Sequence, residues 1–195
     1  MTALSPSMDH GVLADVVPGA RVRDVALVLG GAAFVGLASQ LSVPLPFTPV
    51  PLSLATFAVL LVGAGLGWQR ALPSMLLFMG AGMAGVPWFA DASSGWAMPS
   101  FGYIVGYVAA ATLVGHLARS GADRTALRTF ALMTLGSLTI YAFGVPWLAA
   151  SLDVGLGQAL MLGVVPFLVG DLIKTAAASA LLPAAWSWVD RRHPR

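Results

Sequence analysis

Residues 100–118 read SFGYIVGYVAAATLVGHLA and contain no Asp, Glu, Lys or Arg. A helix that crosses the hydrocarbon core of a bilayer needs about 20 mostly apolar residues, and this stretch has almost that length. In lipid, only α-helices and closed β-barrels satisfy their own backbone hydrogen bonds. A barrel strand would alternate apolar and polar residues, whereas this run is continuously apolar. The stretch therefore predicts a membrane-spanning helix.

The composition of the whole chain extends this interpretation. Of its 195 residues, 58% are hydrophobic and 9% are charged, and the mean hydropathy is +0.85. Soluble domains carry roughly 25% charged residues, so most of the surface of this protein must face lipid. The chain has no cysteine, which excludes disulfides and thiolate metal sites. The net charge of +2 comes from arginines near the ends of apolar runs, so we expect no nucleic-acid partner.

Charges and prolines divide the chain into further apolar segments of spanning length. The predicted fold class is an all-α integral membrane protein with six transmembrane helices. We expect these helices at residues 25–41, 52–66, 71–86, 100–118, 128–150 and 166–186. In this division, residues 1–20 are a flexible cytoplasmic tail, 21–190 form a single six-helix substrate-binding domain, and 191–195 form a basic cytoplasmic tail.

The basic residues predict the orientation of the helices. Apart from Lys174, every Lys or Arg lies before the first span, after the last, or around alternate connections. The other connections, 42–51, 87–99 and 151–165, contain neither Lys nor Arg. Cytoplasmic loops retain positive charge during membrane insertion. We therefore expect an even number of spans, with both termini on the cytoplasmic side.

Two charged residues interrupt the last apolar segment. Asp171 and Lys174 are three positions apart, so on a helix they share one face. An ionised group near the bilayer centre costs about 2.5 to 3.5 kcal/mol on insertion scales, which makes such residues rare without a function. One interpretation is a buried ion pair that fixes helix packing. The other, which we favour, is a substrate site in the outer half of the helix, reachable from outside.

Three motifs resemble those of one known family, and they span nearly the whole chain. The run PFLVGDLIK at 166–174 resembles the Asp-x-x-Lys signature of BioY proteins, the biotin-binding S components of energy-coupling-factor (ECF) transporters. The run VPLPFTPVPLSL at 43–54 resembles the proline-rich first outer loop of that family. Residues 80–103 match its third helix end, the following loop and the start of the fourth helix. The chain departs from the usual Gly-Pro-Thr-x-Gly-Tyr pattern at 97–103, which read AMPSFGY.

The resemblance implies a function and a set of partners. It implies that the chain captures biotin from outside, and that a transmembrane coupling protein and ATPase subunits of an ECF module supply the energy. ATP would then be used only by those partners, and the chain itself would need no cofactor. The implied location is the bacterial cytoplasmic membrane, as a multi-pass protein in the lipid bilayer.

The resemblance also indicates which side chains meet the ligand. Asp171 would accept hydrogen bonds from the ureido N–H groups of biotin, and Lys174 would donate to an oxygen. Pockets are mostly apolar with a few placed polar groups, so aromatic side chains would wall the remainder. The candidates for this wall are Phe47, Trp88, Phe89 and Tyr103. Each of them has the alternative of an interface anchor or simple packing, although Tyr103 opens a helix at the predicted outer face.

Two more residues are candidates with open alternatives. Thr48 would reach the ligand through its hydroxyl if the proline-rich loop folds over the site, but it would equally stabilise a turn. Asp91 is the one charged residue near the third motif that would serve the ligand, and its alternative is a solvated loop charge.

Other functions receive less support from the sequence. No G-x-x-x-x-G-K-[ST] or G-x-S-x-G run occurs, so we expect neither nucleotide binding nor an enzyme. The three histidines are far apart in the sequence, so we expect no metal site. The alternative function is an autonomous proton-coupled carrier, in which Asp171 would change protonation during transport.

Overall fold

The computed structural model describes residues 11–16, 19 and 21–192. Its elements are almost all helical. In chain order they are η1 (Leu13–Val16), α1 (Arg21–Gln40), β1 (Ser42–Val43), β2 (Leu52–Ser53), α2 (Ala55–Leu66), α3 (Trp68–Met83), η2 (Ala90–Ala92), α4 (Phe101–Ala118), α5 (Ala126–Leu152), α6 (Leu156–Gly163), η3 (Val165–Phe167) and α7 (Leu168–Arg192), where η marks a 3-10 helix.

Each of the six predicted spans coincides with one main helix, α1 to α5 and α7. The largest difference is at the end of the last helix, which continues to Arg192 instead of ending near 186. Within the described residues, four helical stretches are long and apolar enough to cross a bilayer: α1, α4, α5 and Leu156–Arg191, which joins α6, η3 and α7. Helices α2 and α3 are shorter, with 12 and 16 residues. The chain is an all-α membrane protein with six main helices.

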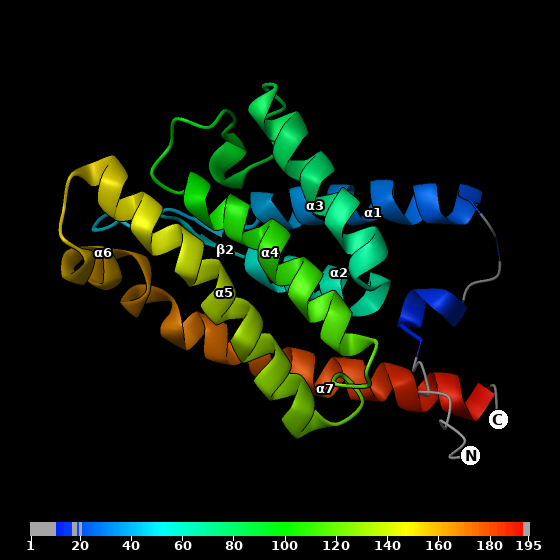
Figure 1. The fold of residues 1–195 in the computed structure, drawn as a ribbon. Helices are drawn as coiled ribbons and strands as arrows, with labels where there is room; N and C mark the ends of the chain where they lie inside the picture. The colour runs from blue at the N-terminus through cyan, green and yellow to red at the C-terminus, as the bar shows by residue number, and fades with distance from the viewer. Residues whose placement is uncertain (1–10, 17–18, 20, 193–195) are drawn as a thin grey trace, which may run out of the picture.

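Helix α4 lies in the middle of the bundle, because it packs against α2, α3 and α5 (Figure 1). Helix α1 packs on α2 and α3, and α7 packs mainly on α5. Contact between α4 and α5 is close at Gly106, where an added Cβ would lie 2.8 Å from the carbonyl oxygen of Ile140. Helices in lipid associate through such tight packing rather than through a hydrophobic effect between them.

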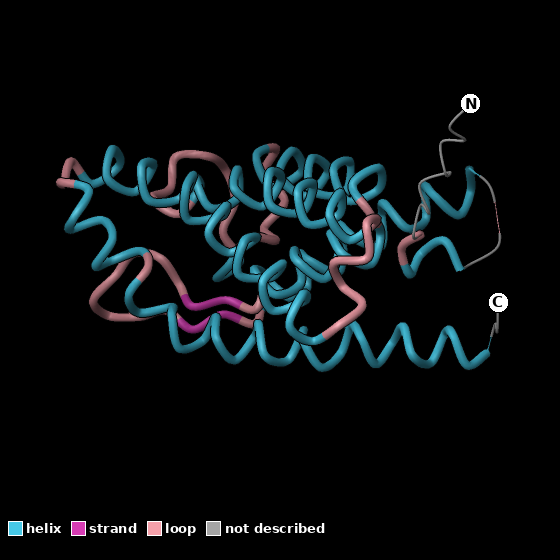
Figure 2. The backbone as a smooth tube through the Cα atoms, turned by 60° about the horizontal axis from the view of Figure 1, so that its bottom comes forward, coloured by secondary structure: helices cyan, strands magenta, loops and turns pink. Residues whose placement is uncertain are grey.

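Among the elements that were not predicted, the two strands and α6 lie at the same end of the bundle. Strands β1 and β2 form an antiparallel hairpin that pairs Ser42 with Ser53 and lies beside α7 (Figure 2). Helix α6 occupies part of 151–165, which we expected to be a connection. Strands of two residues carry no alternating pattern, and an uncharged helix of eight residues cannot be separated from the apolar run that follows it.

Figure 1 shows that the start of α1 and the end of α7 lie at one end of the bundle, together with the α2–α3 and α4–α5 connections. The hairpin and α6 lie at the opposite end. An even number of crossings would place the start of the first helix and the end of the last at the same end of the bundle, and this arrangement is compatible with that expectation.

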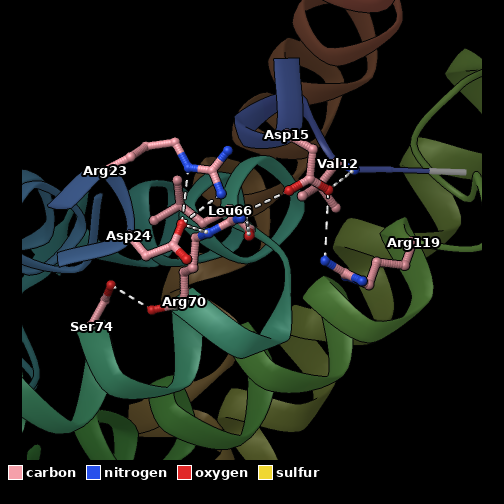
Figure 3. Close-up of polar contacts among 8 residues, drawn as sticks. All are labelled: Val12, Asp15, Arg23, Asp24, Leu66, Arg70, Ser74 and Arg119. Atoms are coloured by element: carbon pink, nitrogen blue, oxygen red, sulfur yellow. Dashed lines mark hydrogen bonds and ion pairs between the residues drawn. The ribbon is translucent and has the colours of Figure 1, made fainter. Parts of the chain in front are cut away.

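Part of segment 1–20, which we expected to be a flexible tail, is packed against the helices. Residues Leu13–Val16 form η1, and Val12 is fully buried. The Asp15 carboxylate bonds to the Arg70 guanidinium at 2.8 Å and lies 3.6 Å from the Arg119 guanidinium (Figure 3). Burial opposes ionisation of Asp15, but the bonds from Arg70 and the Val12 amide outweigh it and hold the pKa of this carboxyl below its ordinary value.

Arg70 explains why this segment packs against the helices. It lies near the start of α3 and is only 8% exposed. A buried guanidinium is stable only when its charge and its N–H groups are paired. Asp24 of α1 supplies a second carboxylate at 2.9 Å, and Arg23 bonds to the same oxygen of Asp24 (Figure 3). Arg70 therefore joins the N-terminal segment, α1 and α3.

Arg70→Ala removes the partner that Asp15 and Asp24 share. Because it leaves Asp15 without its closest counter-charge and Asp24 with Arg23 alone, we expect the midpoint of thermal unfolding in detergent to fall by about 3–8 °C. Arg128→Ala is the matched control, since Arg128 is exposed at the start of α5. Equal midpoints for the two variants would contradict a structural role for Arg70.

A second polar contact at this end involves a fully buried carboxylate. Asp123, in the connection between α4 and α5, accepts a hydrogen bond from the Trp186 indole at 2.6 Å through Oδ2. Its other oxygen has no hydrogen-bond partner among the described residues. Burial raises the pKa of the Asp123 carboxyl, and the bond from Trp186 and the charge of Arg124 only partly oppose this.

The raised pKa predicts a pH dependence of stability. A carboxyl whose folded-state pKa lies above the unfolded value of about 3.9 stabilises the fold at low pH, and this contribution is lost as the pH rises through the folded-state pKa. Asp123→Asn keeps an acceptor for Trp186 and removes the charge. We expect this variant to have a thermal midpoint at pH 7 equal to or above that of the unchanged protein, and a smaller fall in the midpoint between pH 4 and pH 7.

Asp153→Asn, a change of the same type at an exposed residue, serves as the control and should keep the pH dependence of the unchanged protein. A large loss of stability in Asp123→Asn at pH 7 would show that the ionised form is the one the fold requires.

Candidate functional site

One cavity lies among α2, α4, α5 and α7, next to the hairpin. It has a polar part and an aromatic part. The polar part includes Ser53, Thr56, Ser137, Tyr141, Asp171 and Lys174. The aromatic part consists of Phe78, Phe89, Tyr103, Tyr107 and Phe167.

Asp171 and Lys174 both line this cavity, as predicted from their spacing on one helix face. Their side chains are 15% and 16% exposed, and Lys174 Nζ lies 3.5 Å from Asp171 Oδ1. The amine makes shorter bonds to the Ser53 carbonyl oxygen and to the Thr56 hydroxyl, both at 2.8 Å. The two residues are therefore an ion pair and part of a cavity at the same time. The alternatives of a structural pair and a substrate site are both compatible with this geometry.

Lys174 also joins two parts of the chain that are far apart in sequence. Ser53 is in β2, and Thr56 is in the first turn of α2, so the amine of α7 fixes the point where the hairpin enters α2. An ammonium carries three N–H donors, and these three contacts use all of them. A ligand that accepts from Lys174 must share or replace one of these bonds.

Tyr141 of α5 is one of the polar cavity residues that the sequence analysis missed, together with Ser53, Thr56 and Ser137. The Tyr141 hydroxyl donates a short hydrogen bond to Asp171 Oδ2. A tyrosine in the middle of a long apolar helix has to find a polar partner for its hydroxyl, and this is the signal that would have indicated it. Periodicity alone does not reveal which helix supplies the partner.

Two of the four predicted aromatic residues line the cavity. Phe89 is 1% exposed and contacts Phe78 at 5.2 Å between ring centroids. Tyr103 lies in the first turn of α4, and its hydroxyl donates to the Gly163 carbonyl oxygen at 2.9 Å. Tyr103 therefore also anchors the end of α6.

The remaining four candidates do not line this cavity. The Phe47 side chain is 60% exposed, in the loop between the two strands. Thr48 donates to the Leu162 carbonyl oxygen at 2.8 Å and also accepts from the Val50 amide, which is the turn-stabilising arrangement.

Trp88 and Asp91 likewise have structural partners. The Trp88 indole donates to the Phe78 carbonyl oxygen at 2.8 Å. Asp91 accepts from the Ser42 hydroxyl at 2.7 Å and joins η2 to the hairpin. Trp88 thus fixes its loop on α3 and Asp91 fixes η2 on the hairpin, so any contact of either residue with a ligand would require these segments to move.

Metal chemistry has no support in the described part of the chain, where no three His, Cys, Asp or Glu side chains are grouped so as to hold an ion. The site offers one carboxylate, one amine, several hydroxyls and an aromatic wall. This combination suits a small molecule that has both hydrogen-bond donors and acceptors beside an apolar body.

Gly163→Ala tests whether the α6 anchor shapes the cavity. An added Cβ would lie 2.1 Å from the Tyr103 hydroxyl and 2.8 Å from a Leu148 methyl carbon, so Tyr103 must move. Overpacking of this kind costs about 1–3 kcal/mol. Gly157→Ala in the same helix meets nothing within 4 Å and is the control. We expect only Gly163→Ala to lower the thermal midpoint and to weaken ligand binding; equal behaviour would mean that the anchor is dispensable.

The fold and the cavity together define a class: a multi-pass helical membrane protein with a cavity near one end of its bundle, lined by polar and aromatic side chains. The chain belongs to the BioY family, whose profile matches residues 8–191. This is a family of transport proteins, so the chain is a transporter component and not an enzyme.

Individual relatives agree with this assignment. A probable biotin transporter BioY from Pyrococcus horikoshii is 35% identical over 161 residues, which cover 81% of this chain and 93% of that protein. The biotin transporter BioY of Rhizobium etli is 30% identical over 170 residues, covering 82% and 90%. In structure, the chain resembles the crystal structure of the S-component for biotin from an ECF-type ABC transporter, with a TM-score of 0.77, 21% identity, and coverage of 86% and 92%.

Proposed function

We propose that the chain captures biotin in the cavity beside α7 and delivers it inward with an ECF energising module. The observation that carries this proposal is the Asp171–Lys174 pair lining a cavity in a chain of the BioY family. Both charges are kept 15–16% exposed inside an apolar bundle, although such burial is costly.

The chemistry of the cavity suits biotin. The ureido ring has two N–H donors and one carbonyl acceptor, which match the Asp171 carboxylate and the Lys174 amine. The apolar bicycle and chain match the aromatic part of the cavity, where Phe78 and Tyr107 face the space with Phe89. A site that pairs donors with acceptors also rejects analogues that lack one of these groups, because its own polar groups would remain unpaired.

Two observations support energy-supplying partner subunits: the sequence has no ATP-binding motif of the P-loop type, and the chain resembles a transporter subunit. It contains no P-loop run with which to bind ATP phosphates. The similar solved structure is that of an S-component from an ECF-type ABC transporter. We therefore expect a transmembrane coupling protein and ATPase subunits to supply the energy.

The proposed location is the bacterial cytoplasmic membrane, with both termini in the cytoplasm. Arginines support this orientation: Arg70 and Arg119 lie at the same end of the bundle as the start of α1, and the opposite loops contain neither Lys nor Arg. The cavity and the hairpin lie toward that opposite end, so they face outward in this orientation.

A binding experiment tests the proposed function. Protein purified in detergent should bind labelled biotin saturably without nucleotide or an ion gradient. Hydrogen bonds to charged groups contribute about 1.5–3 kcal/mol. Asp171→Asn and Lys174→Ala should therefore each raise the Kd for biotin by about tenfold or more. Asp153→Asn, at an exposed residue outside the cavity, should bind as the unchanged protein does.

Two results would contradict this account in different ways. If the unchanged protein does not bind biotin, the ligand is wrong. If it binds biotin and both Asp171→Asn and Lys174→Ala retain the affinity, the ligand is right and the site is wrong. Biotin uptake into vesicles by the chain alone, driven by a proton gradient and lost in Asp171→Asn, would instead favour the autonomous carrier.

A further inference from the structure

The two oxygens of the Asp171 carboxylate are held from two different directions. Tyr141, on α5, donates its hydroxyl hydrogen to Oδ2 in a short bond. Lys174, on the same helix as Asp171, approaches Oδ1 at 3.5 Å. The amine is 0.7 Å closer to its other two partners, Ser53 and Thr56, at 2.8 Å each. Tyr141 is therefore the closer of the two groups that fix the carboxylate.

Tyr141 is itself held in place by its neighbours. Its ring meets the Tyr103 ring edge to face, with centroids 6.3 Å apart and an interplanar angle of 88°. Tyr103 is anchored through its hydroxyl to the Gly163 carbonyl oxygen at 2.9 Å. It also fits against Gly144, where an added Cβ would lie 2.5 Å from its ring. Two rigid aromatic side chains thus connect the end of α6 to the Asp171 carboxylate.

A carboxylate without such contacts would turn. The torsion of an Asp carboxylate about its last bond is broad and roughly two-fold, so the side chain alone does not fix the plane of the two oxygens. An ionised carboxylate has about four lone-pair sites, of which Tyr141 and Lys174 take two. The remaining sites stay available to a ligand, in an orientation that is set before the ligand arrives.

We propose that Tyr141 is a positioning residue that fixes the plane of the Asp171 carboxylate for a hydrogen bond from a ligand N–H group, such as one ureido N–H of biotin. This inference rests on the proposed function, because it assigns the ligand contact to Asp171. An N–H donor prefers to approach a carboxylate oxygen near the plane of the carboxylate, along the lone-pair directions, so this plane decides whether the bond is well aligned. A carboxylate that is already ordered raises the affinity, because the entropy cost of ordering it is then not subtracted from the free energy of binding.

The proposal predicts the effect of removing the Tyr141 hydroxyl. Tyr141→Phe keeps the ring and its contact with Tyr103 but removes the bond to Asp171. We expect the Kd for biotin to rise by about 10- to 100-fold.

A double-mutant cycle with Asp171→Asn separates positioning from a general structural effect. If Tyr141 acts through the carboxylate, adding Tyr141→Phe to Asp171→Asn should weaken biotin binding by less than about twofold. Thr139→Val removes a hydroxyl from the exposed side of the same helix and should leave biotin binding unchanged. Thermal unfolding of each variant confirms that it is folded.

Two outcomes would overturn the proposal. One is biotin binding in Tyr141→Phe within twofold of the unchanged protein. The other is a full, multiplicative loss in the Tyr141→Phe, Asp171→Asn double variant, which would mean that Tyr141 acts independently of Asp171.

A measurement without ligand keeps this test separate from that of the proposed function. In protein labelled with carbon-13 aspartate, the infrared carboxylate stretch of Asp171 should shift in Tyr141→Phe, and the shift should be absent in the Asp171→Asn background. If the unchanged protein does not bind biotin but the shift is present, the proposed ligand fails while the positioning of Asp171 by Tyr141 stands. If the shift is absent, the positioning role is wrong whatever the ligand.

Discussion

Keeping Asp171 and Lys174 inside an apolar bundle is the constraint on which the rest of the site depends. Removing two charges from water costs several kcal/mol per ion even after relaxation, and their mutual attraction offsets this only with good geometry and further hydrogen bonds. The structure supplies those bonds from three other elements: the hairpin, α2 and α5. Because every contact comes from a different segment, the pair also determines how these segments meet.

The same physical rule explains the opposite end of the protein. Arg70 is more buried than the pair beside the cavity, and it is satisfied by carboxylates from the N-terminal segment and from α1. One charged cluster thus closes the proposed cytoplasmic end, and the other lies at the cavity. Elsewhere in the bundle, small residues such as Gly106 allow neighbouring helices to approach closely.

The sequence predicts more of the fold than of the site, and the reason is physical. Span length and charge placement are properties of continuous segments, so all six main helices were predicted from the sequence. Asp171 and Lys174 were found because a charge in an apolar run is conspicuous. The role of Tyr141 was missed because it depends on a hydrogen-bond partner 30 positions away, and a single tyrosine in an apolar helix is common. The hydrogen bond from Thr48 to the Leu162 carbonyl oxygen was also not predicted, because the two residues are 114 positions apart in the sequence.

The central claim is that the buried acid and amine hold a polar ligand and are not only a packing device. A structure of the protein with biotin bound tests this most directly. The account predicts a ureido N–H within hydrogen-bond distance of the Asp171 carboxylate and the bicycle against the aromatic part of the cavity. Biotin found elsewhere, with Asp171 and Lys174 keeping the contacts they have without ligand, would contradict it.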